Sequence, residues 1–252
     1  MGTVHEMRLE RWGMDRPPLR TLDSAASFID DVGFAVLFGD SEAAFPALRE
    51  AARDDASPRL AAGWGEDLER MWSWKDELPV QGHAWVGRFV CGKQSLLSPR
   101  LLALLIGDTP SADALSPLGR KVAGRLEAEG PTSMRAIRQD YGLNSRTGQR
   151  LLDELGRALV VTNYGTVQDG PGWPSCVIEL TGRAFPGRDG RPVAARRRAA
   201  TRIFLGTVVE AGARELSRAF RWPRREATAV LDDLVERELA VPGAGGGYRL
   251  RA

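Results

Sequence analysis

Cysteine and histidine are scarce in this sequence of 252 residues, which contains only two of each. Cys91 and Cys176 lie far apart and match no metal-ligand spacing, so neither a zinc site nor a disulfide framework is expected. We expect two buried thiols in a protein of the reducing cytoplasm. The sequence also lacks a phosphate-binding loop, a dinucleotide fingerprint and a Ser-His-Asp pattern, so it predicts no metal and no cofactor.

Long apolar runs are missing as well. No run approaches the roughly 18 residues that a membrane-spanning helix needs. The N-terminal segment MGTVHEMRLERWGMDR includes no apolar stretch of the secretory type. Apolar residues still make up 43% of the chain, enough for a sizeable core in two or three small domains. The sequence therefore predicts a cytoplasmic protein with no membrane partner.

Lysine is the third scarce residue, because only Lys75, Lys93 and Lys121 occur among 35 basic residues, the rest being arginine. A GC-rich genome can account for the arginine excess, but it does not explain the uneven placement of charge. Residues 1–110 carry 12 basic and 17 acidic groups, net −5, and residues 111–252 carry the remaining 23 and 16, net +7. A basic C-terminal part indicates an anionic partner such as nucleic acid.

The basic part contains an internal repeat. Met134–Leu155 and Ala213–Leu234 align position by position without a gap, so that Ile137 meets Leu216 and the other apolar positions also coincide. Coinciding apolar positions with different exposed ones are typical of a repeated fold unit. Each copy predicts a helix, a tight turn and a second helix, with a helix before it and two strands after it. This is the order of a winged helix.

The predicted fold is mainly α with short β hairpins, an α+β fold in which tandem winged-helix domains follow an N-terminal α/β or winged-helix-like domain. We expect the N-terminal domain at 1–110, the first winged helix at 111–185 and the second at 195–252. Pro17-Pro18 predicts an irregular lead-in over residues 1–20. Capping residues, apolar periodicity and helix-breaking residues predict helices over Thr21–Val32, Ala43–Arg53, Glu66–Glu77, Leu101–Ile106, Ser116–Glu129, Met134–Tyr141, Ser145–Ala158 and Ala199–Ala211. The same signals predict strands within Phe34–Phe38, Ala84–Leu97, Val160–Val167, Ser175–Leu180, Ala240–Val241 and Tyr248–Leu250. Linkers are expected over Gly107–Ala114 and Arg183–Arg198.

The last helix of a winged helix lies in the major groove of duplex DNA, and the wing touches the backbone. We therefore predict double-stranded DNA as the partner, bound by the outward side of each last helix. A merely solvated face is the alternative, because acidic residues such as Asp153 and Asp232 follow one turn later. The candidate DNA-binding residues are Arg146, Thr147, Gln149 and Arg150 in the first copy, Arg224, Arg225 and Thr228 in the second, and Arg196, Arg197 and Arg198 in the linker.

Tryptophans gather in the acidic N-terminal part, where the segment from Trp64 to Trp85 holds most of those in the chain. The same region is the densest supply of groups suited to cutting a glycosidic bond, which needs a carboxylate or amide and room for an extruded base. Lys75 adds an amine nucleophile. The alternative interpretation of this segment is purely structural: the tryptophans belong to the core and the charged residues lie on the solvated end of a helix. No catalytic residue is therefore assigned. The candidates are Trp72, Trp74, Lys75, Asp76, Glu77, Gln81 and His83.

Three segments carry a family resemblance: SFIDDVGFAVLF at 27–38, WSWKDELP at 72–79, and LLDELGRALVVT at 151–162, the last followed by Trp173, VIEL and the arginine-rich linker. Together they resemble the tandem winged-helix family related to bacterial crosslink-repair DNA glycosylases, over about residues 20–240. The resemblance implies stacked winged helices that bind DNA and remove alkylated bases. Active members carry Gln-x-Gln or Gln-x-Asp after a glycine, whereas Gly33-Phe34-Ala35-Val36-Leu37 is apolar at both polar positions. The family's extra C-terminal domain is not expected in this length.

We therefore expect a DNA-binding protein that acts in DNA repair or protection. Three alternatives stay open: an active alkyl-base DNA glycosylase with a non-standard site, a winged-helix transcriptional regulator, and a protein-interaction scaffold. A regulator binds one sequence as a two-fold dimer. A repair protein binds with little sequence preference and a steep dependence on salt. The sequence leaves the oligomeric state open.

Overall fold

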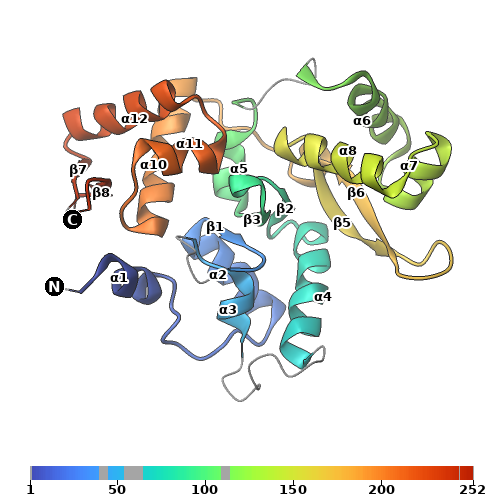
Figure 1. Ribbon diagram of the computed structural model, residues 1–252, viewed down its shortest axis with the longest axis horizontal. Helices are drawn as coiled ribbons and strands as arrows, with labels where there is room; N and C mark the ends of the chain where they lie inside the picture. The colour runs from blue at the N-terminus through green and yellow to red at the C-terminus, as the bar shows by residue number, and fades with distance from the viewer. Residues whose placement is uncertain (1, 40–44, 54–64, 109–113, 244, 252) are drawn as a thin grey trace.

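The computed structural model describes residues 2–39, 45–53, 65–108, 114–243 and 245–251 (Figure 1). Its N-terminal part consists of helices around a small sheet, as the predicted fold class requires. A short 3-10 turn, Val90–Gly92, joins the last two strands of this sheet. The elements in chain order are α1 Val4–Arg11, α2 Leu22–Val32, β1 Phe34–Val36, α3 Leu48–Ala52, α4 Glu66–Val80, β2 Trp85–Arg88, β3 Gln94–Leu97 and α5 Pro99–Leu105.

The N-terminal sheet is antiparallel, with strand order β1-β3-β2, and pairs Phe34 and Trp85 with Leu97. Both of its faces are buried, which is why β1 is a continuous apolar run rather than an alternating one. Ala35 and Val86 face a core formed with α2, α3 and α4. Phe34, Trp85 and Leu97 face a second core that reaches into the C-terminal part of the chain.

The first unit follows, and its order of helices and strands is the order predicted for a winged helix. Each helix begins at a polar cap: Ser116 Oγ accepts from Gly119 N at 3.0 Å, and Ser133 Oγ accepts from Ala136 N at 3.0 Å. Asn144, rather than the predicted Ser145, caps the third helix. The elements are α6 Pro117–Glu129, β4 Thr132–Ser133, α7 Met134–Asp140, α8 Ser145–Arg157, β5 Val161–Val167 and β6 Ser175–Leu180, with sheet order β4-β6-β5, and a short helix α9 Thr181–Ala184 follows.

The second unit repeats this arrangement near the C-terminal end of the described chain. Its helix α12 covers Arg224–Glu236, and both of its ends coincide with those of α8 in the alignment of the two repeats. Pro223 precedes α12, where its fixed φ is compatible with a helix start. The elements are α10 Val193–Val208, α11 Ala213–Phe220, α12, β7 Ala240–Pro242 and β8 Tyr248–Leu250. The repeat in the sequence is therefore a repeat of elements.

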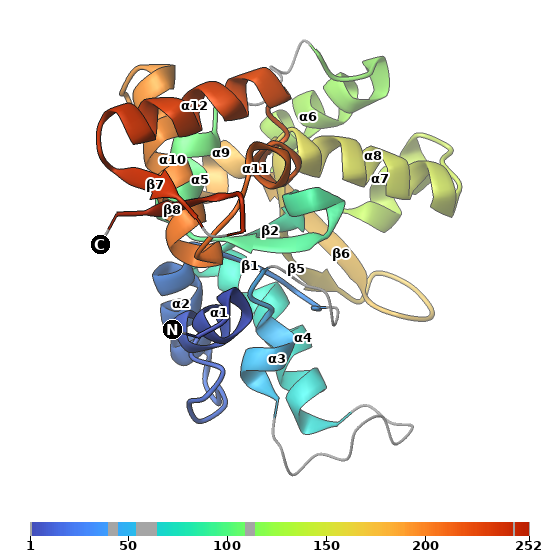
Figure 2. The ribbon, with the colours of Figure 1, turned by 60° about the vertical axis from the view of Figure 1, so that its left-hand side comes forward.

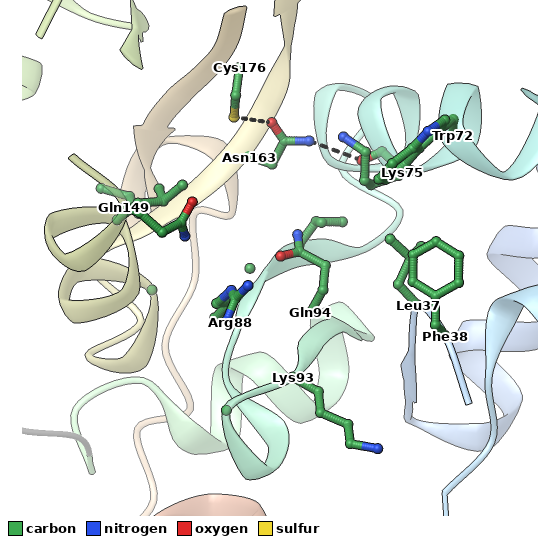
Figure 3. Close-up of a pocket in the computed structure, with 16 residues that line it drawn as sticks. Leu37, Phe38, Trp72, Lys75, Arg88, Lys93, Gln94, Gln149, Asn163 and Cys176 are labelled. Carbon is green, nitrogen blue, oxygen red and sulfur yellow. Dashed lines mark hydrogen bonds between the residues drawn. The ribbon is translucent and has the colours of Figure 1, made fainter. Parts of the chain in front are cut away.

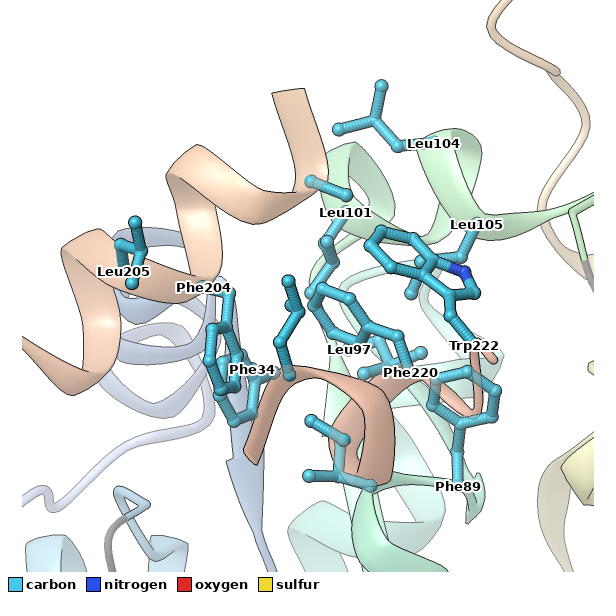
Figure 4. Packing of buried hydrophobic residues seen from close by; sticks show 14 of the residues in the cluster. Phe34, Phe89, Leu97, Leu101, Leu104, Leu105, Phe204, Leu205, Phe220 and Trp222 are labelled. Atoms are coloured by element: carbon cyan, nitrogen blue, oxygen red, sulfur yellow. The ribbon is translucent and has the colours of Figure 1, made fainter. Parts of the chain in front are cut away.

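The second unit shares its core with the N-terminal sheet (Figure 4). Phe34 from β1 stacks on Phe204 from α10, with ring centroids 5.9 Å apart and an angle of 9° between the rings. Phe204 in turn meets Phe220 from α11 edge to face at 5.4 Å. Such aromatic pairs contribute about 0.5–1.5 kcal/mol each beyond the area they bury. Strands from the start of the chain and helices from its end are therefore held by one cluster.

Residues 1–20 are not an irregular lead-in, because α1 forms within them. Thr3 and Glu6 make a capping box, in which each side chain bonds the backbone N–H of the other. The helix is anchored by side chains that donate to carbonyls at the C-terminal end of α10, groups that a helix leaves without intrahelical partners. These bonds are Arg8 Nε to Val208 O at 2.7 Å, Arg11 Nε to Gly206 O at 2.9 Å and Trp12 Nε1 to Thr207 O at 2.7 Å.

The first unit docks on the N-terminal part through β5 and α8 (Figure 2). Trp85 Nε1 donates to Val161 O and to Thr181 Oγ1, both at 3.1 Å. On α8, a Cβ at Gly156 would lie 3.3 Å from the backbone N of Arg88, so glycine lets the helix approach the strand. One side of α8 is therefore covered by the protein itself.

Three predicted boundaries are wrong. The α4 helix continues through Pro79 to Val80 rather than ending before Leu78. The predicted linker Arg183–Arg198 overlaps the last two residues of α9 and contains the first turns of α10, and α10 ends at Val208 rather than Ala211. Part of the predicted helix Ala43–Arg53 and most of the linker Gly107–Ala114 lie outside the described residues. Among the helices that the structure describes, none is long and apolar enough to cross a membrane.

Candidate nucleic-acid interface and adjoining pocket

The predicted DNA-contacting residues of α8 lie at its N-terminal end. Arg146, Gln149 and Arg150 are exposed, and Thr147 is half-buried. Within the described chain, neither arginine has a carboxylate at salt-bridge distance. Thr147 Oγ1 bonds Asn144 Oδ1 at 3.1 Å, and Gln149 Nε2 donates to Asp153 Oδ1 at 2.7 Å. The two arginines are therefore available to an anion, whereas the threonine and the amide already have partners in the protein.

The second set lies at the start of α12. Arg224, Arg225 and Thr228 are all exposed. Thr228 Oγ1 donates to Arg224 O at 3.0 Å, as threonine often does inside a helix. Neither arginine makes an ion pair with another described residue. Both predicted helix starts therefore present two uncompensated positive charges.

Arg157 and Arg221, which the sequence analysis did not single out, join these two sets. Arg157 is at the C-terminal end of α8, and Arg221 is in the turn between α11 and α12 in the left-handed conformation, with φ of 60°. Both are exposed and have no carboxylate partner among the described residues. Burial, and then the positive charge of Arg157, lowers the pKa of Arg221. Two like charges thus meet where the two units adjoin.

The six arginines form one surface feature, here named the arginine row. In both ribbon views α11 lies beside the C-terminal end of α8 and the start of α12 (Figures 1 and 2), and the charge of Arg157 on α8 acts on Arg221, which precedes α12. A helix of the length of α8 extends about 20 Å, so α8 alone spans several phosphates of a DNA backbone. The row consists of Arg146, Arg150, Arg157, Arg221, Arg224 and Arg225.

The three predicted linker arginines lie elsewhere, in α10, and bind groups of the protein. Arg196 is 7% exposed and donates to Leu104 O at 3.1 Å and Ile106 O at 2.8 Å. Hydrogen bonding to Asp108 raises the pKa of Arg197, which also pairs with Glu226. Arg198 pairs with Asp233 at 2.7 Å. Because their charges are compensated, these three are not included in the interface proposed below.

A pocket of about 570 Å³ opens beside α8, between the end of the N-terminal sheet, α4 and β5 (Figure 3). Its volume is in the range of small-molecule sites. No Asp or Glu is among the described residues that line it. The lining combines three cations, three amides and two aromatic rings: Leu37, Phe38, Trp72, Lys75, Val86, Gly87, Arg88, Gly92, Lys93, Gln94, Gln149, Leu152, Gly156, Val161, Asn163 and Cys176.

The floor of the pocket is a cross-strand row of Leu37, Gln94 and Arg88. Arg88 pairs with Gln94 in the sheet, and Leu37 N donates to Gln94 O at 2.8 Å. Leu37 is the second position at which active members of the resembled family carry a polar residue, and Ala35, the first, is fully buried in the core. The Gln94 side chain has no hydrogen-bond partner among the described residues, and it points into the pocket (Figure 3). An amide is thus present directly beside the apolar Leu37.

A chain of hydrogen bonds on the opposite wall fixes Asn163. Burial raises the pKa of the Cys176 thiol to about 11, so the thiol is protonated at neutral pH and donates to Asn163 Oδ1 at 2.9 Å. Asn163 Nδ2 donates to Asp76 Oδ1 at 2.8 Å and to Lys75 O at 3.3 Å. In a regular helix that carbonyl would accept from residue 79, but Pro79 has no N–H. Asn163 therefore repairs the hydrogen bonding of α4.

The tryptophan-rich candidates are divided by the period of α4. Trp72 and Lys75, one helical turn apart, face the pocket, and Lys75 Nζ lies 5.0 Å from the Trp72 ring centroid. Trp74 is buried in the core, and Glu77 accepts from Ser73 on the other side of the helix. Gln81 and His83 do not line this pocket. Across the described residues, no group of His, Cys, Asp and Glu side chains could hold a metal ion.

Comparisons with known proteins agree with this arrangement. The family described as AlkZ related matches residues 19–216. The fold is similar to that of the Streptomyces sahachiroi DNA glycosylase AlkZ, with a TM-score of 0.58 and 16% sequence identity, covering 98% of this chain and 68% of that one. A likeness at this identity establishes the fold alone. No curated protein sequence matches the chain significantly.

Proposed function

The chain belongs to the AlkZ-related family, and we propose that it binds double-stranded DNA through the arginine row in the course of DNA repair. The observation that carries this proposal is the row itself, six arginines along α8 and the start of α12 that have no carboxylate partner in the described part of the chain. Arginine pairs with phosphate oxygens in a bidentate geometry. The solved structure with a similar fold is a DNA glycosylase, which agrees with a role in repair.

The geometry favours contact with the DNA backbone over reading of its sequence. The side of α8 that includes Gly156 is packed against β2, and Gln149 donates to Asp153. Arginines of the row can reach phosphates from the exposed side. Phosphate contacts fix a protein on the duplex but carry no sequence information. We therefore propose weak sequence preference, as expected of a repair protein and not of a transcriptional regulator.

The test is the salt dependence of duplex binding. Each phosphate contact contributes about −0.9 to the slope of log K against log salt concentration. In the R157A/R221A variant we expect weaker binding and a slope shallower by about 2, measured by fluorescence anisotropy with a labelled duplex of arbitrary sequence. The R16A/R202A variant removes the same charge from exposed arginines outside the row and should bind like the parent protein. If the salt-dependence slopes of the two variants were equal, the arginine row would not be part of the DNA interface.

A second candidate function, removal of an altered base, is supported by Gln94. An extruded base needs a pocket beside the DNA-binding surface and groups that read its edge. The pocket adjoins α8, and Gln94 offers an unpartnered donor and acceptor. Incubation with alkylated or crosslinked duplex should then yield abasic sites, and Q94A should reduce that yield without weakening DNA binding. Binding without abasic sites in the parent protein would leave only the non-catalytic role.

A further inference from the structure

Two of the three lysines of this chain line the pocket. Lys75 and Lys93 face it, whereas Lys121 is exposed on α6. The other 32 of the 35 basic residues are arginine, so a positive charge in this chain is normally supplied by arginine. An amine differs from a guanidinium in one chemical respect that matters here: it can lose a proton and attack a carbonyl carbon. The pocket therefore holds amines where a charge alone would not require them.

Lys75 is held by two neighbours. Its side chain is 14% exposed, and its Nζ contacts the Asp76 carboxylate and lies 5.0 Å from the Trp72 ring centroid. Asn163 holds that carboxylate at 2.8 Å and is itself fixed by the protonated thiol of Cys176. Figure 3 shows Lys75 and Asn163 side by side on the wall opposite Gln94. The amine thus has a fixed neighbour that can accept its proton.

We propose that Lys75 forms an imine with the aldehyde of an abasic site in DNA. This rests on the proposed DNA binding, because an abasic sugar must be brought to the pocket beside α8. The ammonium proton passes to the Asp76 carboxylate, and the free amine adds to C1′ of the ring-opened sugar. The alkoxide formed on the former carbonyl oxygen takes up that proton. Loss of water from the resulting carbinolamine gives the imine, so the step consumes an amine and an aldehyde and releases one water.

The remaining lining suits such a substrate. Lys93 supplies positive charge for the phosphates that flank an abasic sugar, and so does Arg88, which is 44% exposed although it pairs with Asp153 at 3.3 Å. No described lining residue is acidic. Phe38 and Trp72 meet edge to face at 5.9 Å and offer apolar surface to a neighbouring base. The pocket therefore combines a nucleophile with a partly cationic wall, and the proton acceptor Asp76 contacts the nucleophile from outside the lining.

The experiment is reductive trapping on the full chain. The protein is mixed with a duplex that contains one abasic site and is treated with borohydride, which reduces an imine to a stable amine. We expect a covalent protein–DNA adduct, located by peptide mass at Lys75. The adduct should be lost in K75R, which keeps the charge beside Asp76, and should persist in K93R and in the control K121R. Thermal unfolding should be unchanged in K75R, which checks that the loss of the adduct is not a loss of folding.

Three results would overturn the proposal. An adduct that persists in K75R, or maps to Lys93 or the N-terminal amine, would place the reaction elsewhere. Binding of abasic duplex by the parent protein without any adduct would refute the imine and leave the DNA-binding proposal intact. A parent protein that binds no duplex at all would refute both.

Discussion

Replacing Asn163 should cost stability in a way that depends on Pro79, a residue of a distant part of the chain. In N163A the Lys75 carbonyl loses the donor that stands in for the N–H missing at Pro79, and Asp76 loses a bond of 2.8 Å. A neutral hydrogen bond contributes about 1 kcal/mol and one to a charged group about 1.5–3 kcal/mol. Since Asp76 keeps its contact with Lys75 and is 23% exposed, we expect a loss near the lower end, about 2–3 kcal/mol. Urea denaturation of both proteins measures it.

The matched background is P79A, in which the restored N–H of residue 79 can bond the Lys75 carbonyl as in a regular helix. There N163A should cost about 1 kcal/mol less, and the coupling free energy follows from the four unfolding curves. Packing lost at the proline itself cancels in this cycle. Additive costs would show that Asn163 does not repair the hydrogen bonding of α4.

Three further expectations concern other contacts. G156A should lose about 1–3 kcal/mol in urea denaturation, because its Cβ would press on the Arg88 backbone at 3.3 Å. G124A, with nothing within 4 Å, should instead gain about 0.5–1 kcal/mol as a helix interior site. Because burial raises the Cys176 pKa from 9.0 to about 11, stability should be full below pH 9 and fall by about 2–3 kcal/mol towards pH 11, a loss that C176A should not show. W85F should loosen the docking of β5 and lose about 1–3 kcal/mol, since two hydrogen bonds disappear.

Each expectation has an outcome that would contradict it. Equal stability of G156A and G124A would mean that α8 does not press on β2. If the stability of the parent protein and of C176A depended on pH in the same way between pH 9 and 11, the Cys176 thiol would be in contact with solvent. For W85F, an unchanged unfolding midpoint would show that the hydrogen bonds of the Trp85 indole do not stabilise the docking of β5.

The helices and strands could be read from the sequence where local signals decide them. Ser133, the glycine-rich turns and the internal repeat predicted α7, α8, α11 and α12, because caps and apolar periodicity act over short stretches of chain. The Thr3/Glu6 capping box was an equally local signal for α1, and Pro17-Pro18 obscured it. The end of α4, which depends on a distant partner, was missed: the helix continues past Pro79, where Asn163 supplies a donor in place of the N–H that proline lacks.

The site was harder to predict for the same reason. Arg196, Arg197 and Arg198 are compensated by carboxylates and carbonyls 29 to 92 residues away, which a run of arginines does not indicate. The pocket brings together residues of α4, β2, β3, α8, β5 and β6 and of the segment that follows β1. The polar Arg88 and Gln94 were the available sign, since they pair across two neighbouring strands and therefore lie on one face of the same sheet.

The aromatic cluster of Phe34, Phe204 and Phe220 has a consequence for the order of synthesis. The strand that contributes Phe34 leaves the ribosome long before α10 and α11, the helices that cover it, have been made. Until then one face of the sheet, with Trp85 and Leu97, has no cover, so the nascent N-terminal part should attract chaperones. All residues of the first unit's own core have been synthesised at Leu180. The first unit can therefore fold before the N-terminal part and the second unit have packed against each other. Maturation of this chain should therefore be limited by the second unit, which is synthesised well after the N-terminal part, and not by the N-terminal part itself.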